Sequence, residues 1–141
     1  MPDAAAHAAG SVGFAAGDAQ PYVHRVVNTG TSPVHIIDVE IKLPADHRTG
    51  SASSAAPTAI DNDRIRAYTI SLAPGQSSAP IELGPGVLVV MPGAAVEQTK
   101  SGGKSERVGA KGARWRWRPA GSYGLRNRSG ATALAVEVEI K

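Results

Sequence analysis

The chain has no cysteine, one phenylalanine and only 4% aromatic residues. Without cysteine there can be no disulfide bond, no thiolate metal site and no cysteine nucleophile. With so few aromatics, a core has to be built from Val, Ile, Leu and Ala, which the 42% hydrophobic content allows. The length of 141 residues suits one compact domain.

Long apolar runs are also missing. The longest is VLVVM at 87–91, which is far too short to span a bilayer. The first twenty residues contain neither a basic segment nor a continuous apolar run, so they do not read as a signal peptide. We therefore expect no membrane partner and a cytoplasmic location, with which the lack of cysteine is compatible.

Glycine and proline, in contrast, are abundant. Sixteen glycines and ten prolines divide the chain into short pieces, and a helical period is weakly visible only in the first fifteen residues. This pattern predicts an all-β protein with many short strands. We expect strands at residues 22–28, 34–43, 64–72, 86–91, 94–99, 114–118, 123–127 and 132–140, with a hairpin loop at KSGGKSE (100–106).

The chain also contains an internal repeat. Residues 28–42 (NTGTSPVHIIDVEIK) and 127–141 (NRSGATALAVEVEIK) align without a gap, Asn28 falls on Asn127, and VEIK is identical in both. Each copy predicts a turn followed by an alternating strand. In the second copy the valines and Ile140 point to one side of the strand and the glutamates to the other.

Several sequence segments resemble the cupins, a family of small jelly-roll barrels with two sequence motifs. NDRIRAYTISLAPGQSS and GPGVLVVMPG resemble the first motif, and PAGSYGLRNRSGATALAVEVEIK resembles the second motif with its closing strand. The resemblance implies an all-β, cupin-like jelly-roll β-sandwich or barrel at 61–141. Residues 17–43 look like a partial second copy contributing strands, 44–60 form a linker or long loop, and 1–16 form a flexible N-terminal segment.

The metal motifs of that family are absent. A metal-binding cupin supplies a His-x-His pair, often with a Glu, from its first motif and a His from its second. Residues 48–141 contain no histidine, and Glu82 is the one possible donor in the first motif. The four histidines are His7, His24, His35 and His47. We therefore expect no metal and no cofactor.

The phrase RWRWR (114–118) holds both tryptophans of the chain. In a strand the tryptophans share one face and the arginines share the other. In one interpretation the tryptophans fill the barrel or a dimer interface, and the arginines are solvated or paired with acidic strands. In the other, the arginines line the barrel mouth and bind an anion, with tryptophan as a stacking wall. A net charge of +3 is too small to favour nucleic acid, which we do not expect as a partner.

Three functions remain open from the sequence. The first is a metal-free, cupin-like protein that binds a small molecule, for instance an anion, in the barrel mouth. Its candidate ligand contacts are Glu82, Arg116, Trp117, Arg118 and Tyr123, with no catalytic residue among them. The second is a metal-dependent dioxygenase or isomerase that uses His24. The third is a structural module, since an edge strand such as VHIIDVEI invites pairing and predicts a homodimer.

Overall fold

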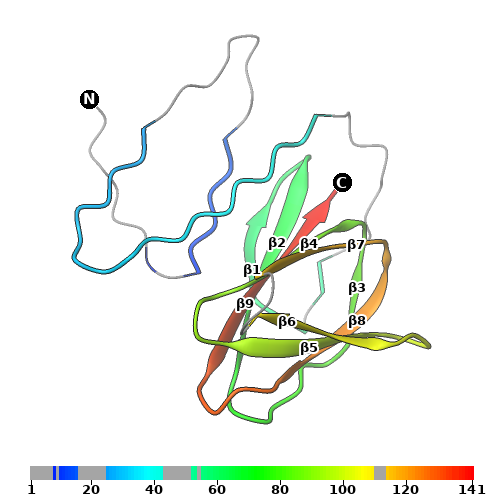
Figure 1. Ribbon diagram of the computed structural model, residues 1–141. Coiled ribbons are helices and arrows are strands. Elements are labelled where there is room, and N and C mark those ends of the chain that lie inside the picture. Colours follow the sequence, from blue (N-terminus) through cyan, green and yellow to red (C-terminus); the bar gives the residue numbers. More distant parts are fainter. Residues whose placement is uncertain (1–7, 9, 16–24, 43–51, 54, 110–113) are drawn as a thin grey trace.

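The structure of the protein is a computed structural model, which describes residues 8, 10–15, 25–42, 52–53, 55–109 and 114–141. Nine β-strands form in these residues and pack as two antiparallel sheets (Figure 1). Over the same residues there is no helix long and apolar enough to cross a membrane. The prediction of an all-β sandwich is confirmed.

The two sheets differ in size. The five-stranded sheet has the order β1 (Thr58–Asp61), β2 (Ile65–Leu72), β9 (Ala133–Ile140), β4 (Gly86–Val90), β7 (Trp115–Arg118). The four-stranded sheet has the order β3 (Ile81–Leu83), β8 (Gly121–Asn127), β5 (Ala95–Lys100), β6 (Ser105–Gly109). Strands distant in sequence are therefore neighbours, as in a jelly roll.

The core lies between the sheets and follows from the alternation of each strand. On β2, Tyr68, Ile70 and Leu72 face inward and are buried. Leu88 on β4 and Leu125 on β8 meet them from other strands. Aliphatic side chains thus form most of this core, as the scarcity of aromatics requires.

The outer faces of the two sheets have opposite character. Ala67, Val87, Val89 and Val136 form a second apolar cluster on the outside of the five-stranded sheet. The outside of the four-stranded sheet carries charged and hydroxyl side chains instead, which suits contact with water. An apolar outer face has to be covered by something.

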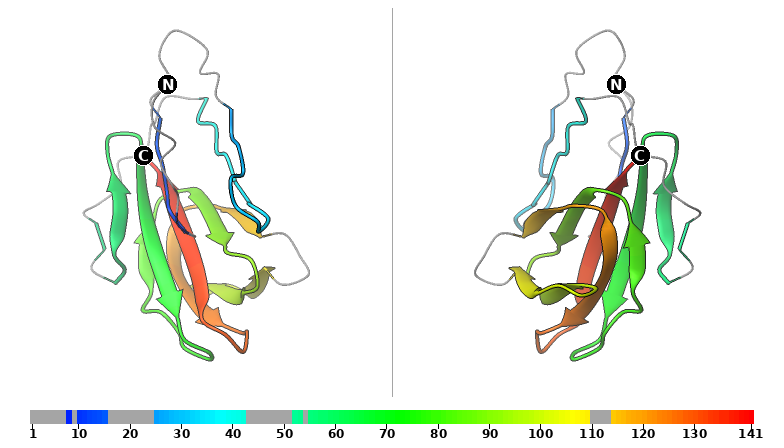
Figure 2. Two further views of the ribbon diagram at one scale, coloured as in Figure 1. Left: turned by 90° about the vertical axis from the view of Figure 1, so that its left-hand side faces the viewer. Right: turned by 90° about the vertical axis from the view of Figure 1, so that its right-hand side faces the viewer.

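Residues 10–15 supply part of that cover. Val12 packs against the outer apolar cluster, and a β-carbon on Gly10 would come within 2.5 Å of the Leu134 side chain on β9. Figure 2 shows this segment running beside the C-terminal strand. Gly10 also has a φ of 79°, so both its backbone angle and this contact favour glycine.

The strands expected before residue 58 do not form. Residues 25–42 contain no strand; they run as an extended arm outside the sandwich (Figures 1 and 2), while 22–24 and 43 lie outside the described residues. The alternating pattern is present, but no neighbouring strand supplies hydrogen-bond partners there. Conversely, the sequence did not indicate β1, β3 or β6, and β1 begins inside the predicted linker 44–60.

The turn of the internal repeat is nevertheless built twice. The Asn127 side chain accepts a hydrogen bond from the Ser129 amide at 2.8 Å and donates one to the Ala131 carbonyl at 2.7 Å. Asn28 makes the same pair of bonds, with the Gly30 amide at 3.0 Å and a carbonyl four residues on at 2.8 Å. The second copy of the turn leads into β9, and the first leads into the unpaired arm.

Candidate functional site

A charged cluster lies inside the sandwich beside the aliphatic core. Arg118 of β7 and Glu137 of β9 face inward, and both side chains are 1% exposed. The Arg118 Nε donates to Glu137 Oε2 at 2.7 Å, and Gln98 Nε2 of β5 donates to Glu137 Oε1 at 2.8 Å. The cluster thus joins the two sheets through one buried carboxylate.

The rest of the Arg118 guanidinium is also engaged. It donates to the Gly84 carbonyl, and its carbon lies 5.4 Å from the centre of the Tyr123 ring. The Tyr123 hydroxyl donates to the Pro119 carbonyl at 2.8 Å. Because its donors and charge are matched by these groups, the Arg118 guanidinium is not available to a ligand.

Burial changes the proton affinity of this cluster. Loss of hydration raises the pKa of Glu137, while the charge and hydrogen bond of Arg118 act in the opposite direction. Burial likewise raises the pKa of Tyr123, which keeps its hydroxyl protonated. Arg118 thus opposes the effect of burial on Glu137, and the two opposite charges are held together inside the fold.

More ion pairs lie at the ends of the sandwich. Arg66 of β2 donates to Asp61 at 3.0 Å and lies 3.7 Å from Glu139, whose other oxygen accepts from the Gly84 amide at 2.6 Å. Near the edge strands β6 and β7, Arg116 pairs with Glu106. The acidic face of β9 is therefore paired with arginine, one of the two states expected from the sequence.

The interior does not fit a divalent metal of the kind that cupins bind. Such a site needs three or four converging nitrogen or oxygen donors. Here the buried carboxylate of Glu137 already faces a guanidinium, whose positive charge would repel a cation. Over the described residues no three His, Asp or Glu side chains come together as a metal site. His24 and His47 lie outside those residues.

The RWRWR strand places its two residue types on opposite faces. Trp115 and Trp117 pair in register with Val89 and Val87, so both tryptophans lie on the outer apolar face. They are 53% and 52% exposed and do not fill the barrel. Arg118 points inward from the same strand. A tryptophan on one face cannot form a stacking wall for arginines on the other.

The five predicted ligand contacts therefore do not converge. Arg118 and Tyr123 lie together in the interior, and Arg116 lies at its edge, paired with Glu106. Trp117 faces outward from one sheet. Glu82 faces outward from the other, because its neighbours Ile81 and Leu83 are buried. Whether any of them binds a ligand stays a prediction.

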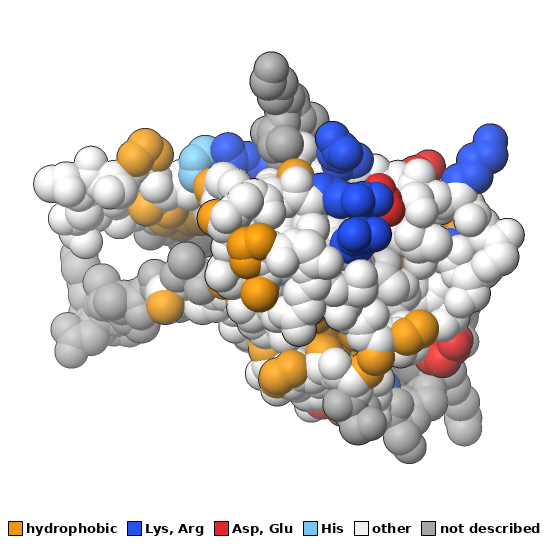
Figure 3. Space-filling view, turned by 90° about the horizontal axis from the view of Figure 1, so that it is seen from below, with side chains coloured by type: hydrophobic (Ala, Val, Ile, Leu, Met, Phe, Trp, Pro, Cys, Tyr) orange, Lys and Arg blue, Asp and Glu red, His pale blue; other side chains and the backbone are white. Residues whose placement is uncertain are grey.

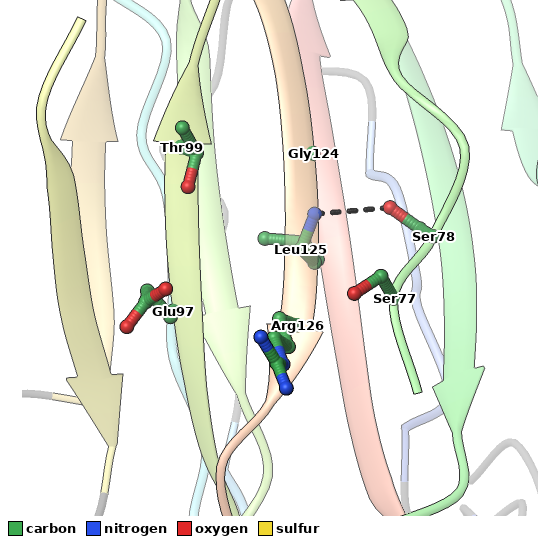
Figure 4. Close-up of a pocket in the computed structure, with 7 residues that line it drawn as sticks. All are labelled: Ser77, Ser78, Glu97, Thr99, Gly124, Leu125 and Arg126. Atoms are coloured by element: carbon green, nitrogen blue, oxygen red, sulfur yellow. Dashed lines mark hydrogen bonds between the residues drawn. The ribbon is translucent and has the colours of Figure 1, made fainter. Parts of the chain in front are cut away.

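An open hollow lies instead on the outside of the four-stranded sheet. Its volume is about 260 Å³, and its lining residues are Ser77, Ser78, Glu97, Thr99, Gly124, Leu125 and Arg126 (Figure 4). A β-carbon on Gly124 would have no atom within 4 Å, so the space above this residue is empty. Figure 4 shows Glu97 and Thr99 on one side of β8 and the two serines on the other.

The charge around the hollow is mainly positive. Glu97 of β5 pairs in register with Arg126 of β8 on one side and with Arg107 of β6 on the other. Arg128 donates to the same carboxylate at 2.9 Å. Three arginines thus surround one glutamate. Figure 3, seen from the side where β5 and β6 lie, shows Lys and Arg side chains gathered with fewer acidic ones.

Sequence reasoning did not find this hollow. No motif in the sequence brings Ser77, Ser78, Arg126 and Arg128 together as a group. One signal was available: Gly124 is a small residue between two buried positions of a strand, Tyr123 and Leu125. A glycine on the outer face of a strand leaves a gap there.

Comparison with known proteins identifies the fold. No family model and no curated protein matches the sequence. A solved cupin domain from Bordetella pertussis Tohama I is similar at a TM-score of 0.50 and 22% identity, covering 67% of this chain and 99% of that one. A cupin superfamily protein from Desulfitobacterium hafniense DCB-2 is similar at 0.46 and 14%, covering 67% and 82% respectively. The chain has the cupin fold, and the resemblance seen in the sequence is confirmed.

Proposed function

We propose that the protein is a metal-independent binding protein of cupin fold that takes a small organic anion in the outer hollow above Gly124. The observation that carries this proposal is the exposed guanidinium of Arg126, which has no ion-pair partner among the described residues. A carboxylate or phosphate group is the natural partner of such a fork of donors.

The neighbouring groups support an anionic ligand. Arg107 and Arg126 flank Glu97 in register, and Glu97 already accepts from Arg128, so the charge around the hollow is positive. The Ser77 hydroxyl stands close enough to line the same space, and Gly124 lets a ligand approach the backbone. The interior site expected from the sequence is less suited, because Arg118 is already paired there.

Metal independence is supported by the occupied interior. The Arg118–Glu137 pair places a matched charge between the sheets, beside the aliphatic core. The alternative, a metal-dependent enzyme using His24, has a direct test in elemental analysis before and after chelation. One stoichiometric metal that is lost in His24→Ala would replace our proposal with that alternative.

Ligand binding is tested by calorimetric titration with citrate and with inorganic phosphate. We expect one of these anions to bind the wild-type chain, and Arg126→Gln to weaken it by about 1.5–3 kcal/mol, the value of a charge-assisted hydrogen bond. Lys104→Gln is the matched control, since it removes one exposed positive charge from the β5–β6 loop. Equal losses in both variants would indicate unspecific attraction and refute the site.

A second variant tests the hollow itself. Gly124→Val places its β-carbon in the empty space, where no atom lies within 4 Å, and the Gly124 φ is not positive. We expect this variant to keep the thermal midpoint of the wild type and to lose anion binding. Unchanged binding in Gly124→Val would place the ligand elsewhere.

A further inference from the structure

We infer that the ligand of the outer hollow is an acidic amino acid, which is a molecule with two carboxylates and an ammonium group on the chain between them. This inference rests on the proposed function and deepens it, because it names the class of anion that the hollow selects. It follows from the order of charges on three neighbouring strands, with Arg107 on β6, Glu97 on β5 and Arg126 on β8.

The register of the four-stranded sheet places these three charges in one row. Glu97 is the direct cross-strand partner of Arg107 on one side and of Arg126 on the other. All three side chains lie on the outer face, because alternation along each strand turns their buried neighbours inward. The α-carbons of the two arginines are two strand spacings apart, about 9.5 Å. The row is therefore positive, negative and positive over that width.

The two ends of the row are open to a ligand, and its centre is fixed. Arg107 and Arg126 are exposed, and neither forms an ion pair among the described residues. Arg128 instead holds Glu97, with its Nε and Nη2 donating to the two carboxylate oxygens at distances of 2.9 to 3.1 Å. An ionised carboxylate has about four acceptor positions, so Glu97 can still accept one hydrogen bond from the hollow that it lines.

This order of charges distinguishes between kinds of anion. An anion with a single charged group meets only one of the two arginines. A plain dicarboxylate reaches both, but its centre then lies over Glu97, where its charges are repelled. An ammonium group in the chain between the carboxylates removes this conflict, because it donates to Glu97 while the carboxylates meet the two guanidinium groups.

The two ends of the row have different roles. Ser77 forms a β-bridge with Arg126, so its hydroxyl lies beside that arginine on the wall of the hollow. Gly124, two residues before Arg126 on the same face, leaves the space above the sheet empty. The Arg126 end therefore anchors one carboxylate, and Glu97 and Arg107 select what the rest of the ligand carries.

Calorimetric titration with three related compounds tests the selection. L-glutamate has all three charged groups, glutarate has the same chain without the ammonium group, and L-glutamine has a neutral amide in place of the second carboxylate. We expect the wild-type chain to bind L-glutamate about fivefold more tightly than either of the others. That factor is the upper value for one exposed ion pair.

Two variants assign these preferences to residues. Glu97→Gln should bind L-glutamate and glutarate equally, because both the partner of the ammonium group and the repulsion of glutarate are lost. Arg107→Gln should bind L-glutamate and L-glutamine equally. Lys104→Gln is the matched control and should keep both preferences, because it removes an exposed positive charge from the β5–β6 loop, outside the row. A thermal midpoint close to that of the wild type confirms that each variant is folded.

Failure of this inference is distinguishable from failure of the proposed function. If L-glutamate, glutarate, citrate and phosphate all fail to bind, both are wrong. If anions bind and Arg126→Gln weakens them, but the wild type does not prefer L-glutamate, the hollow holds an anion and the acidic amino acid is refuted. A preference for L-glutamate over glutarate that persists in Glu97→Gln refutes it as well.

Discussion

Removal of the Arg118 charge is the sharpest test of the buried cluster. In Arg118→Met the side chain keeps much of its length but leaves the Glu137 carboxylate inside the sandwich without its counter-ion. Both side chains are 1% exposed, so solvent cannot replace the guanidinium. Breaking a buried pair from one side costs about 3–5 kcal/mol of folding free energy.

The double variant Arg118→Met/Glu137→Gln should be more stable than the single one. It removes the uncompensated charge, and the new amide oxygen still accepts the hydrogen bond from Gln98, 2.8 Å away in the wild type. Since replacing both charges of a buried pair is often neutral, we expect it to recover at least about half of the loss. The second substitution then acts as a rescue.

Urea unfolding followed by circular dichroism measures both variants. In Arg118→Met the pKa of Glu137, already raised by burial, loses the partner that opposed this shift. A raised acid pKa favours the folded state below the unfolded pKa of about 4.3 and loses that advantage as pH rises through the folded pKa. The deficit of Arg118→Met should therefore grow from pH 4 towards neutrality. A loss below about 1 kcal/mol at neutral pH, or a double variant no better than the single, would refute a charge-matched interior.

Three further outcomes follow from single residues. Gly86→Ala should prevent normal folding, seen as loss of the cooperative unfolding transition, because the new β-carbon would lie 1.8 Å from the Val138 carbonyl oxygen; a stable variant would contradict this packing. Asn127→Ala should lower the free energy of unfolding by about 2–4 kcal/mol, since it removes several hydrogen bonds of a buried side chain; a loss under 1 kcal/mol would show that the turn does not need it. Hydrogen bonding from Lys141 lowers the pKa of Asp61. The stabilisation of the folded state by the Asp61 carboxylate is therefore present above the unfolded pKa and is lost as pH falls through the folded pKa. Asp61→Asn should reduce the fall in the free energy of unfolding as pH is lowered. An unchanged pH dependence would argue against the Asp61–Lys141 pair.

The strands that the sequence predicted well are those whose alternation is long and whose neighbours complete them. β2, β4 and β9 match their expected ranges to within about two residues, the usual uncertainty of strand ends. β3 has three residues and β6 is largely exposed, so neither has a pattern strong enough to identify. Residues 34–42 have the alternating pattern but pair with no strand among the described residues. The sequence of one segment does not determine whether a neighbouring strand is there to pair with it.

The candidate site was predicted in its parts but not in its arrangement. Alternation correctly separates the tryptophans of β7 from its arginines, but it does not say which set faces the core. That choice depends on Glu137, whose carboxylate comes from a strand 19 residues further along the chain. The usual expectation of apolar-in and polar-out gives the reverse answer here.

This reversal has a physical origin in β9. The strand points glutamates into the sandwich and valines out of it, so it needs arginine inside and an apolar cover outside. β9 has both, because Arg118 and Arg66 meet its carboxylates and residues 10–15 lie over its outer face. The arm carries the same reversed pattern in Asp38 and Val39, but in the described part of the chain it meets neither an arginine partner nor an apolar cover. A strand of this kind is stable only where neighbouring surfaces offer cations on one face and apolar groups on the other.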